Sequence, residues 1–247
     1  MVSDISMVLF WKMLIRIGET EWTKSGQYTG RSNIPLTADG EKQVISSARV
    51  VVGPGKMIDP SRITQLFISP RLRALRTYEL LFDESTRHHF EGKVEITEDI
   101  REWDYGLYEG ILPSQAKAGR KERGLDRDRP WNIWVDGCEE GESPAEIKSR
   151  LDGVIAKIRE IQGPYMHGEK PVDVVIIAHG QILRAFARLW LGFEVGVKLP
   201  MMLEPGAVGV LSYEHHNVDE PAFMLGVNMA DRGRIKSIGS GKDERPY

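Results

Sequence analysis

The chain has a single cysteine, Cys138, among its 247 residues. One thiol excludes an intrachain disulfide framework and any zinc site built on paired thiolates. Apolar runs of the length that spans a membrane, about 20 residues, are also missing. The mildly apolar start, Met1 to Trp11, ends at Lys12 and lacks both a basic region and a small-residue cleavage site. We therefore expect no signal, no membrane anchor and a reducing, cytoplasmic setting.

An excess of one charge sign is lacking too, since 33 Lys and Arg residues face 36 Asp and Glu residues and give a net charge of −3. Nothing in this balance favours nucleic acid or a membrane surface as a partner, although basic residues can still cluster locally. The expected partner is a small molecule. The composition leaves a homo-oligomer open.

The order of apolar segments predicts an α/β fold: a three-layer sandwich with a mostly parallel central sheet and helices on both faces. Expected strands are 13–16, 63–69, 94–97, 172–178 and 208–213. Segment 172–178 is almost continuously apolar, which is typical of a strand buried on both faces, so it should be central. We expect one domain over residues 1–230 and a mobile tail over 231–247, which is rich in Gly, Ser and charge.

Helices are expected after Thr37, after Pro70, after Ser143 and after Gly180. The third has the clearest start, because an N-cap serine, a proline and a capping-box glutamate follow one another at 143–146. The stretch 120–141, dense in charge, Gly and Trp, is predicted to be a loop or lid.

Polar side chains follow four of these strands, and open α/β sheets bind ligands at the carboxyl ends of their strands. Arg16 follows the first strand, Arg73 opens the helix after the second, segment 101–106 follows the third, and His179 and Gly180 follow the central strand. Arginines that meet helix N-termini form a site for an anion, with phosphate as the obvious candidate. Each arginine alone is more simply explained as a surface ion pair, but the set favours a site.

Taken together, these motifs resemble the histidine phosphatases, also called the phosphoglycerate mutase-like superfamily, and within it the fungal type of sedoheptulose-1,7-bisphosphatases. The resemblance covers roughly residues 13–225. It rests on six segments in the right order: RIGETEWTKSGQYTG (16–30), SPRLRA (69–74), REWDYG (101–106), RPWNIW (129–134), AHG (178–180) and GVLSYEHHN (209–217).

The resemblance implies roles for individual residues. Arg16 and Arg73 would hold phosphoryl oxygens, His179 would be the second pocket histidine, and Glu102 would donate a proton to the leaving alcohol. The aromatic neighbours of Glu102 would raise its pKa toward that of a useful acid. The histidine that becomes phosphorylated in the family maps onto Ile17. An isoleucine has no lone pair to attack with, so we do not expect efficient phosphatase turnover.

Three hypotheses follow from Ile17. In the first, Glu102 and His179 catalyse acid–base chemistry on another, anionic small molecule in the same pocket, without a cofactor. In the second, the chain is a non-catalytic protein that binds a sugar phosphate or a phosphorylated partner. In the third, it is a sugar phosphatase inactivated by engineering, which is the least favoured because isoleucine suits a strand end and looks like natural drift.

Further positions carry weaker predictions. Thr23, Thr29 and Gly30 match the stretch that contacts substrate in relatives, with loop capping as the alternative, and Gly180 belongs to the anion site. No metal is expected: His215 and His216 would point to opposite faces of a strand, without a carboxylate to complete a site. Residues 131 and 134, both tryptophan, are expected to anchor the long loop in the core.

Overall fold

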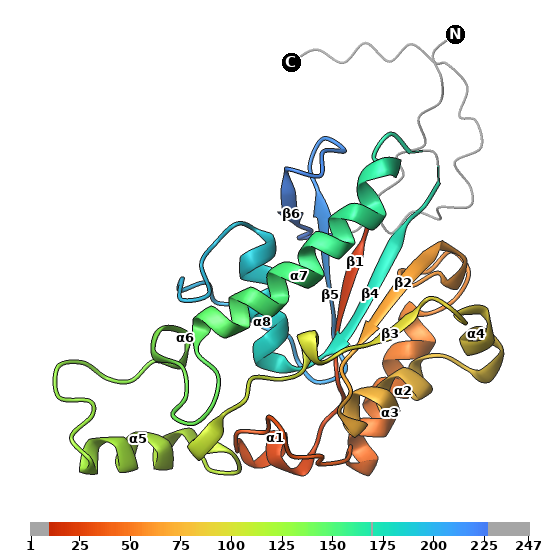
Figure 1. The fold of residues 1–247 in the computed structure, drawn as a ribbon. Coiled ribbons are helices and arrows are strands. Elements are labelled where there is room, and N and C mark those ends of the chain that lie inside the picture. The colour runs from red at the N-terminus through yellow and green to blue at the C-terminus, as the bar shows by residue number, and fades with distance from the viewer. Residues whose placement is uncertain (1–9, 169, 227–247) are drawn as a thin grey trace, which may run out of the picture.

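The computed structural model describes residues 10–168 and 170–226, and the predicted tail at 231–247 lies outside them. The described residues contain one sheet of six strands in the order β3-β2-β4-β1-β5-β6 (Figure 1). The strands are β1 (Lys12–Arg16), β2 (Ile63–Ile68), β3 (Val94–Ile96), β4 (Asp173–Ala178), β5 (Val208–Tyr213) and β6 (Pro221–Phe223). β1 to β4 run parallel, whereas β5 pairs antiparallel with β1, and β6 with β5. The predicted α/β fold with a mostly parallel sheet is confirmed.

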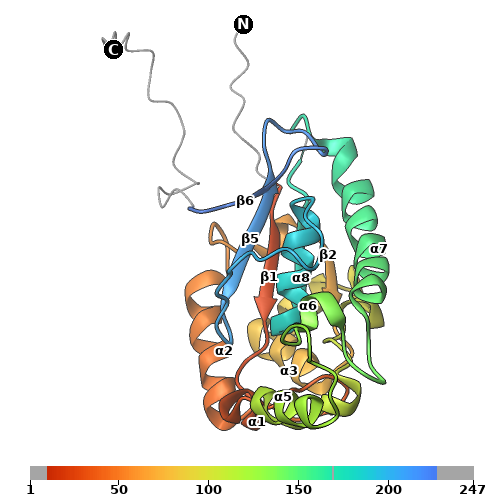
Figure 2. The same cartoon turned by 90° about the vertical axis from the view of Figure 1, so that its left-hand side faces the viewer.

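Helices cover both faces of this sheet, with α2 and α7 on opposite sides (Figure 2). The α-helices are α1 (Glu21–Ser25), α2 (Ala38–Val51), α3 (Leu72–Leu81), α4 (Glu84–His89), α5 (Pro113–Glu122), α6 (Ile133–Asp136), α7 (Pro144–Gln162) and α8 (Gly180–Trp190). Short 3-10 turns lie at Pro60–Arg62, Glu98–Ile100, Gly106–Tyr108 and Gly163–Tyr165. Among these helices, none combines the length and the apolar composition needed to cross a bilayer.

The central strand β4 explains why the sheet needs two helical layers. All six of its residues are buried. Val174 and Ile176 belong to the core shared with α7 and α8, whereas Val175 and Ile177 belong to the core shared with α2 and α3. Successive side chains of a strand point to opposite faces, so an uninterrupted apolar run requires cover on both sides. The prediction that 172–178 is central is confirmed, with the strand starting one residue later, at Asp173.

Helix starts follow the capping signals of the sequence. The Ser143 hydroxyl accepts from the Glu146 amide while the Glu146 carboxylate accepts from the Ser143 amide at 2.8 Å, which completes the predicted capping box. Thr37 caps α2 with one hydrogen bond, which its hydroxyl accepts from the Gly40 amide at 2.9 Å. The helix after Pro70 begins at Leu72, and α8 begins at Gly180 itself.

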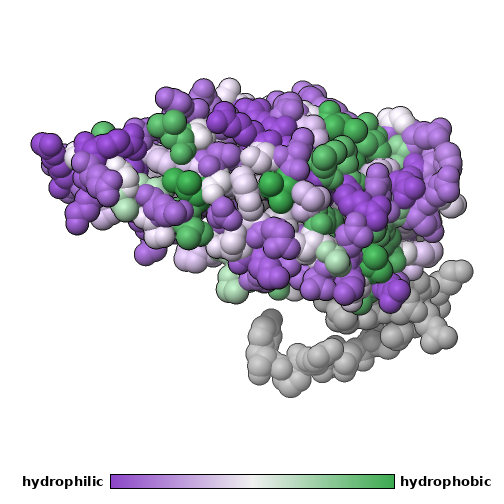
Figure 3. Space-filling model, turned by 90° about the horizontal axis from the view of Figure 1, so that it is seen from below, coloured by the Kyte–Doolittle hydropathy of each residue, from purple (hydrophilic) through white to green (hydrophobic). Residues whose placement is uncertain are grey.

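Several short elements were not predicted, namely α1, α4 and β6. The expectation of a loop over 120–141 was wrong in part, because this stretch contains the end of α5 and the single turn α6. Hydrophilic side chains cover the projecting end of the molecule that contains α5 (Figures 1 and 3). Trp131 is buried, and Trp134 packs edge-on against Trp103, so both anchor the stretch to the core as predicted.

Candidate functional site

The carboxyl ends of β1, β2 and β4 meet at one pocket of about 190 Å³. Eight of the nine residues singled out in the sequence line it; the exception is Gly30. The lining consists of Arg16, Ile17, Thr23, Gly26, Gln27, Tyr28, Thr29, Arg73, Glu102, Tyr105, His179, Gly180, Gln181 and Arg184. A larger hollow of about 660 Å³ between α2, α3 and α4 is mostly apolar and contains none of these residues.

Ile17 continues the extended backbone of β1 into this pocket. Its amide donates to the Ala178 carbonyl at 3.0 Å and its carbonyl accepts from the Gly206 amide at 3.0 Å. The side chain is only 3% exposed and packs within the core that α2 and α3 cover. The residue beside Arg16 therefore contributes shape and apolar surface to the pocket, but no nucleophile and no proton.

Both ring nitrogens of His179 are occupied by protein groups. Nδ1 accepts from Nε of Arg73 at 3.2 Å, which leaves the proton on Nε2, 2.7 Å from the Ser69 hydroxyl. Burial, together with nearby Arg73, holds the pKa of His179 well below its usual range. The imidazole is therefore neutral and in the tautomer that donates to Ser69. In this tautomer it does not accept the hydroxyl proton, so Ser69 and His179 do not form a nucleophile–base pair.

Arg73 is buried and directs most of its donors to the backbone. Its guanidinium donates to the carbonyls of Ser32 at 2.7 Å and of Thr29 and Gly30 at 3.0 Å each. Glu109 binds the same loop from the other side, through the amides of Gly30 and Ser32. The predicted phosphate clamp thus lines the pocket, but its main contacts hold loop 29–32 and His179 in place.

Arg16 and Arg184 present the pocket's other positive charges. NH1 of Arg16 donates to the Leu203 carbonyl at 2.6 Å, and Nε of Arg184 donates to the Met201 carbonyl at 3.1 Å. A Cβ atom built on Gly180 would lie 3.4 Å from Nε of Arg16 and 3.5 Å from NH1 of Arg184, so the two guanidiniums lie close together at the start of α8. Burial and the neighbouring Arg184 lower the pKa of Arg16.

Within the described part of the chain, Arg16, Arg73 and Arg184 form no ion pair with a carboxylate. Carbonyl dipoles orient a guanidinium but do not cancel its charge. The pocket therefore keeps a local excess of positive charge beside the N-terminus of α8, which favours an anion.

Glu102 is buried beneath this N-terminus. Its Oε1 accepts from the amides of Trp103 at 2.8 Å and Ile182 at 2.9 Å, and Oε2 accepts from the amide of Gln181 at 3.0 Å. Burial raises the pKa of Glu102, while these N–H groups and nearby Arg73 oppose the rise. Glu102 thus caps α8 and still faces the pocket, where Oε2 has an acceptor position left beyond Gln181.

Of the smaller predicted residues, Thr23 and Thr29 line the pocket, whereas Gly30 does not. The Thr23 hydroxyl donates to the Thr20 carbonyl at 2.8 Å within the capping box of α1, and the Thr29 hydroxyl donates to the Gln27 carbonyl at 3.2 Å. Gly30 lies behind the pocket, where a Cβ atom would approach the Trp103 carbonyl to 2.3 Å. The hydrogen bonds of Thr23 and Thr29 are therefore those of local loop capping, the alternative given for them from the sequence. Gly30 permits close packing against Trp103.

Six lining residues were missed in the sequence: Gly26, Gln27, Tyr28, Tyr105, Gln181 and Arg184. Arg184 lies four residues after Gly180 on a predicted helix, and this spacing places both on the same helix face, so the signal was present. The rings of Tyr28 and Tyr105 stack with centroids 4.5 Å apart and form an aromatic wall. Nothing in the sequence spacing links these two residues.

The expectation for His215 and His216 was wrong in its geometry. β5 ends at Tyr213, and both histidines adopt left-handed backbone conformations, with φ of 47° and 53°. The following hairpin brings Glu220 back, and its carboxylate lies 2.6 Å from Nδ1 of His215. Glu214, His215 and Glu220 consequently place ligand-type atoms within 4.8 Å of one another on the exposed surface. This group lies outside the pocket.

Comparison with known proteins identifies the class that this fold and pocket define. Residues 13–221 match the histidine phosphatase superfamily, branch 1, and the chain belongs to this superfamily. It is 39% identical to the sedoheptulose 1,7-bisphosphatase of Saccharomyces cerevisiae, over 86% of this chain and 91% of the relative. It is 29% identical to an acid phosphatase of Mycobacterium tuberculosis, over 82% of this chain and 86% of that protein.

Solved structures agree with this assignment. The product of an open reading frame of Mycobacterium tuberculosis superimposes with a TM-score of 0.61 at 25% identity, over 87% of this chain and 96% of that one. The alpha-ribazole phosphatase of Shigella flexneri superimposes with a TM-score of 0.67 at 19% identity, over 87% and 95% of the two chains, and this likeness concerns the fold alone.

Proposed function

We propose that this chain binds the phosphate group of a sugar phosphate, or a small anion of similar shape, in the pocket between Arg16, Arg184 and the start of α8. We further propose that Ile17 stands at the position of the family's nucleophilic histidine, so that the bound phosphoryl group is not transferred to the protein. The single observation that carries the proposal is the juxtaposition of a buried isoleucine with these two guanidiniums, which form no ion pair with a carboxylate of residues 10–168 or 170–226.

The anion binds here for a physical reason. Two like charges held close together repel each other, and an anion between them replaces that repulsion by charge-assisted hydrogen bonds. The amides of Gln181 and Ile182 already bind Glu102, so the two guanidiniums supply the main donors to the anion. The sedoheptulose 1,7-bisphosphatase relative suggests a sugar phosphate as the ligand, whereas the missing nucleophile argues against covalent turnover.

Isothermal titration calorimetry with sedoheptulose 1,7-bisphosphate, its monophosphate products and inorganic phosphate tests this proposal. We expect binding by the wild-type protein and its loss in the paired variant Arg16→Met/Arg184→Met. Arg76→Met, which removes an arginine paired with Glu41 on the surface, serves as the matched control and should bind like the wild type. Absence of binding to every ligand at millimolar concentration would contradict the proposal.

The placement of Glu102 supports a second candidate function, acid catalysis on a small anionic substrate. Glu102 faces the pocket, its pKa is raised by burial, and Oε2 retains an acceptor position. His179 is less suited to act as a base, because Arg73 occupies Nδ1. If this function holds, Glu102→Gln abolishes turnover of a substrate that the wild type converts, while anion binding persists. Unchanged turnover in this variant would exclude Glu102 as the acid.

A further inference from the structure

A buried carboxylate that does not line the pocket, that of Glu142, accepts four hydrogen bonds. Glu142 is 6% exposed. Its Oε1 accepts from NH2 of Arg101 at 2.6 Å and from Nε of Arg150 at 2.9 Å, while Oε2 accepts from NH2 of Arg150 at 3.0 Å and from the amide of Asp104 at 2.9 Å. The bidentate pair with Arg150 is the strong geometry for a guanidinium and a carboxylate.

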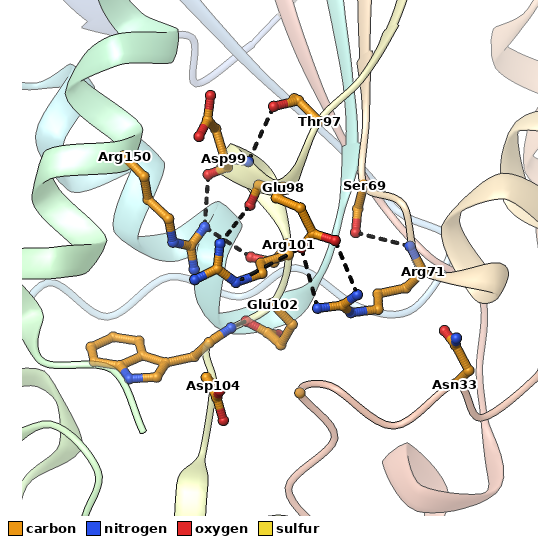
Figure 4. A network of polar contacts seen from close by, with 12 residues as sticks. Asn33, Ser69, Arg71, Thr97, Glu98, Asp99, Arg101, Glu102, Asp104 and Arg150 are labelled. Carbon is orange, nitrogen blue, oxygen red and sulfur yellow. Dashed lines mark hydrogen bonds and ion pairs between the residues drawn. The ribbon is translucent and has the colours of Figure 1, made fainter. Parts of the chain in front are cut away.

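Arg150 extends this contact to the backbone of the segment that carries Glu102. It projects from α7, and its NH1 donates to the carbonyls of Asp99 at 2.7 Å and Arg101 at 3.0 Å (Figure 4). Its side chain is only 8% exposed. One arginine thus connects the long helix α7, the Glu142 carboxylate and two carbonyls of the segment after β3.

The contacts of this pair lie on both sides of Glu102 in the chain. The carbonyl before it, of Arg101, is bound by Arg150, and the amide two residues after it, of Asp104, is bound by Glu142. The Glu142 main chain adds two bonds: its carbonyl accepts from Nε1 of Trp103 at 2.9 Å, and its amide donates to the Asp104 carbonyl at 2.9 Å. Residues 101–104 consequently have little freedom, and the Glu102 carboxylate points to the amides of α8.

We propose that Glu142 and Arg150 are positioning residues, which hold segment 101–104 so that Glu102 caps α8 at the floor of the pocket. Neither residue lines the pocket, so they act through Glu102 and not on the ligand. The assignment goes beyond anion binding and holds for either candidate function, because both need α8 and Glu102 in place. The ionisable groups around Glu102 are Arg16 of β1, Arg73 of α3, Arg150 of α7, Tyr105 and His179.

Amide hydrogen exchange of the full chain, measured by NMR without ligand, tests the assignment directly. The amides of Gln181 and Ile182 report on the Glu102 cap, and Glu102→Ala gives the value for a missing cap. In Arg150→Lys, which keeps the charge but loses the bidentate geometry, and in Glu142→Gln, we expect these two amides to exchange at least about tenfold faster than in the wild type, as for a local opening. Lys148→Met, which removes an exposed cation two residues from Arg150, should leave them unchanged.

Amides far from the Glu102 cap distinguish a local opening from a general loss of stability. If the whole fold loosens, amides in β4 and in the middle of α7 lose as much protection as those at the start of α8, whereas the assignment requires a larger loss at 101–104 and at the start of α8 than in β4 and α7. Should a single variant fail to fold, Glu142→Leu/Arg150→Met removes both charges and leaves neither partner without the other. Wild-type protection of Gln181 and Ile182 in the folded variants would overturn the assignment, and so would an equal loss of protection throughout the fold.

Discussion

Four arginines around the pocket and the Glu102 segment fall into two groups. Arg101 and Arg150 share the carboxylate of Glu142, which offsets part of their positive charge. Arg16 and Arg184 line the pocket and are held by main-chain carbonyls instead. The same side chain therefore serves two purposes: paired with a carboxylate it fixes a loop, and oriented only by carbonyls it keeps its charge for an anion.

Removing the carboxylate from the paired group should have the largest effect on stability. We expect Glu142→Gln to lower the free energy of unfolding by about 3–5 kcal/mol, because it leaves a buried guanidinium without its counter-charge. Urea denaturation measures this loss. In Lys148→Met, which breaks an exposed ion pair on the same helix, the change should stay within about 0.5 kcal/mol. Equal effects of the two substitutions would remove the distinction between the two groups of arginines.

Removing a charge from the pocket group should instead affect ligand affinity. We expect Arg16→Met to weaken sulfate binding by about 1.5–3 kcal/mol, the range for hydrogen bonds to charged groups, which is roughly a ten- to hundredfold rise in Kd. Calorimetry measures the affinity, with Arg76→Met as the surface control. Sulfate affinity equal to that of the wild type would show that Arg16 does not face the bound anion.

Glu102 connects the two groups and gives the smallest expected effect, a dependence on pH. Burial raises its pKa in the folded state, so the protonated form is favoured there, and its contribution to stability is present at low pH and lost as the pH rises through the folded pKa. A protonated Glu102 also removes a negative charge from the pocket. Sulfate, whose own charge is constant over this range, should therefore bind more tightly as the pH falls from neutral toward 5.

The control for this dependence is Glu102→Gln, in which the affinity for sulfate should vary less with pH. His179 does not produce the same trend, because its pKa lies well below the usual range and it stays neutral. Sulfate affinity that falls with falling pH in the wild type would contradict the expected sign.

The fold and the place of the pocket followed from local signals. Ser143 and Glu146 indicate the start of α7, and the apolar run at 172–178 predicts a strand with two buried faces. Side chains that follow parallel strands necessarily meet at one edge of the sheet, so Arg16, Arg73 and His179 could be placed together before any coordinates.

The features that the sequence did not indicate are the directions of side-chain hydrogen bonds and the contacts between loops that lie far apart in the chain. Nothing in its spacing shows that Arg73 directs its donors to loop 29–32, or that Glu142 returns to bind Arg150 and the segment around Glu102. The hairpin that brings Glu220 to His215 is equally hidden, because two left-handed residues that are not glycine form its turn. These features arise from packing between segments, which periodicity and capping signals do not encode.

The rate of phosphate release from a sugar bisphosphate, compared between the wild type and Ile17→His under identical conditions, tests most directly whether the pocket binds without phosphoryl transfer. We expect no release above the buffer rate from the wild type, and measurable release from the variant, because a histidine at this position supplies an attacking nitrogen beside Arg16. Release by the wild type at the rate of the variant would contradict the proposal that Ile17 has replaced an essential nucleophile.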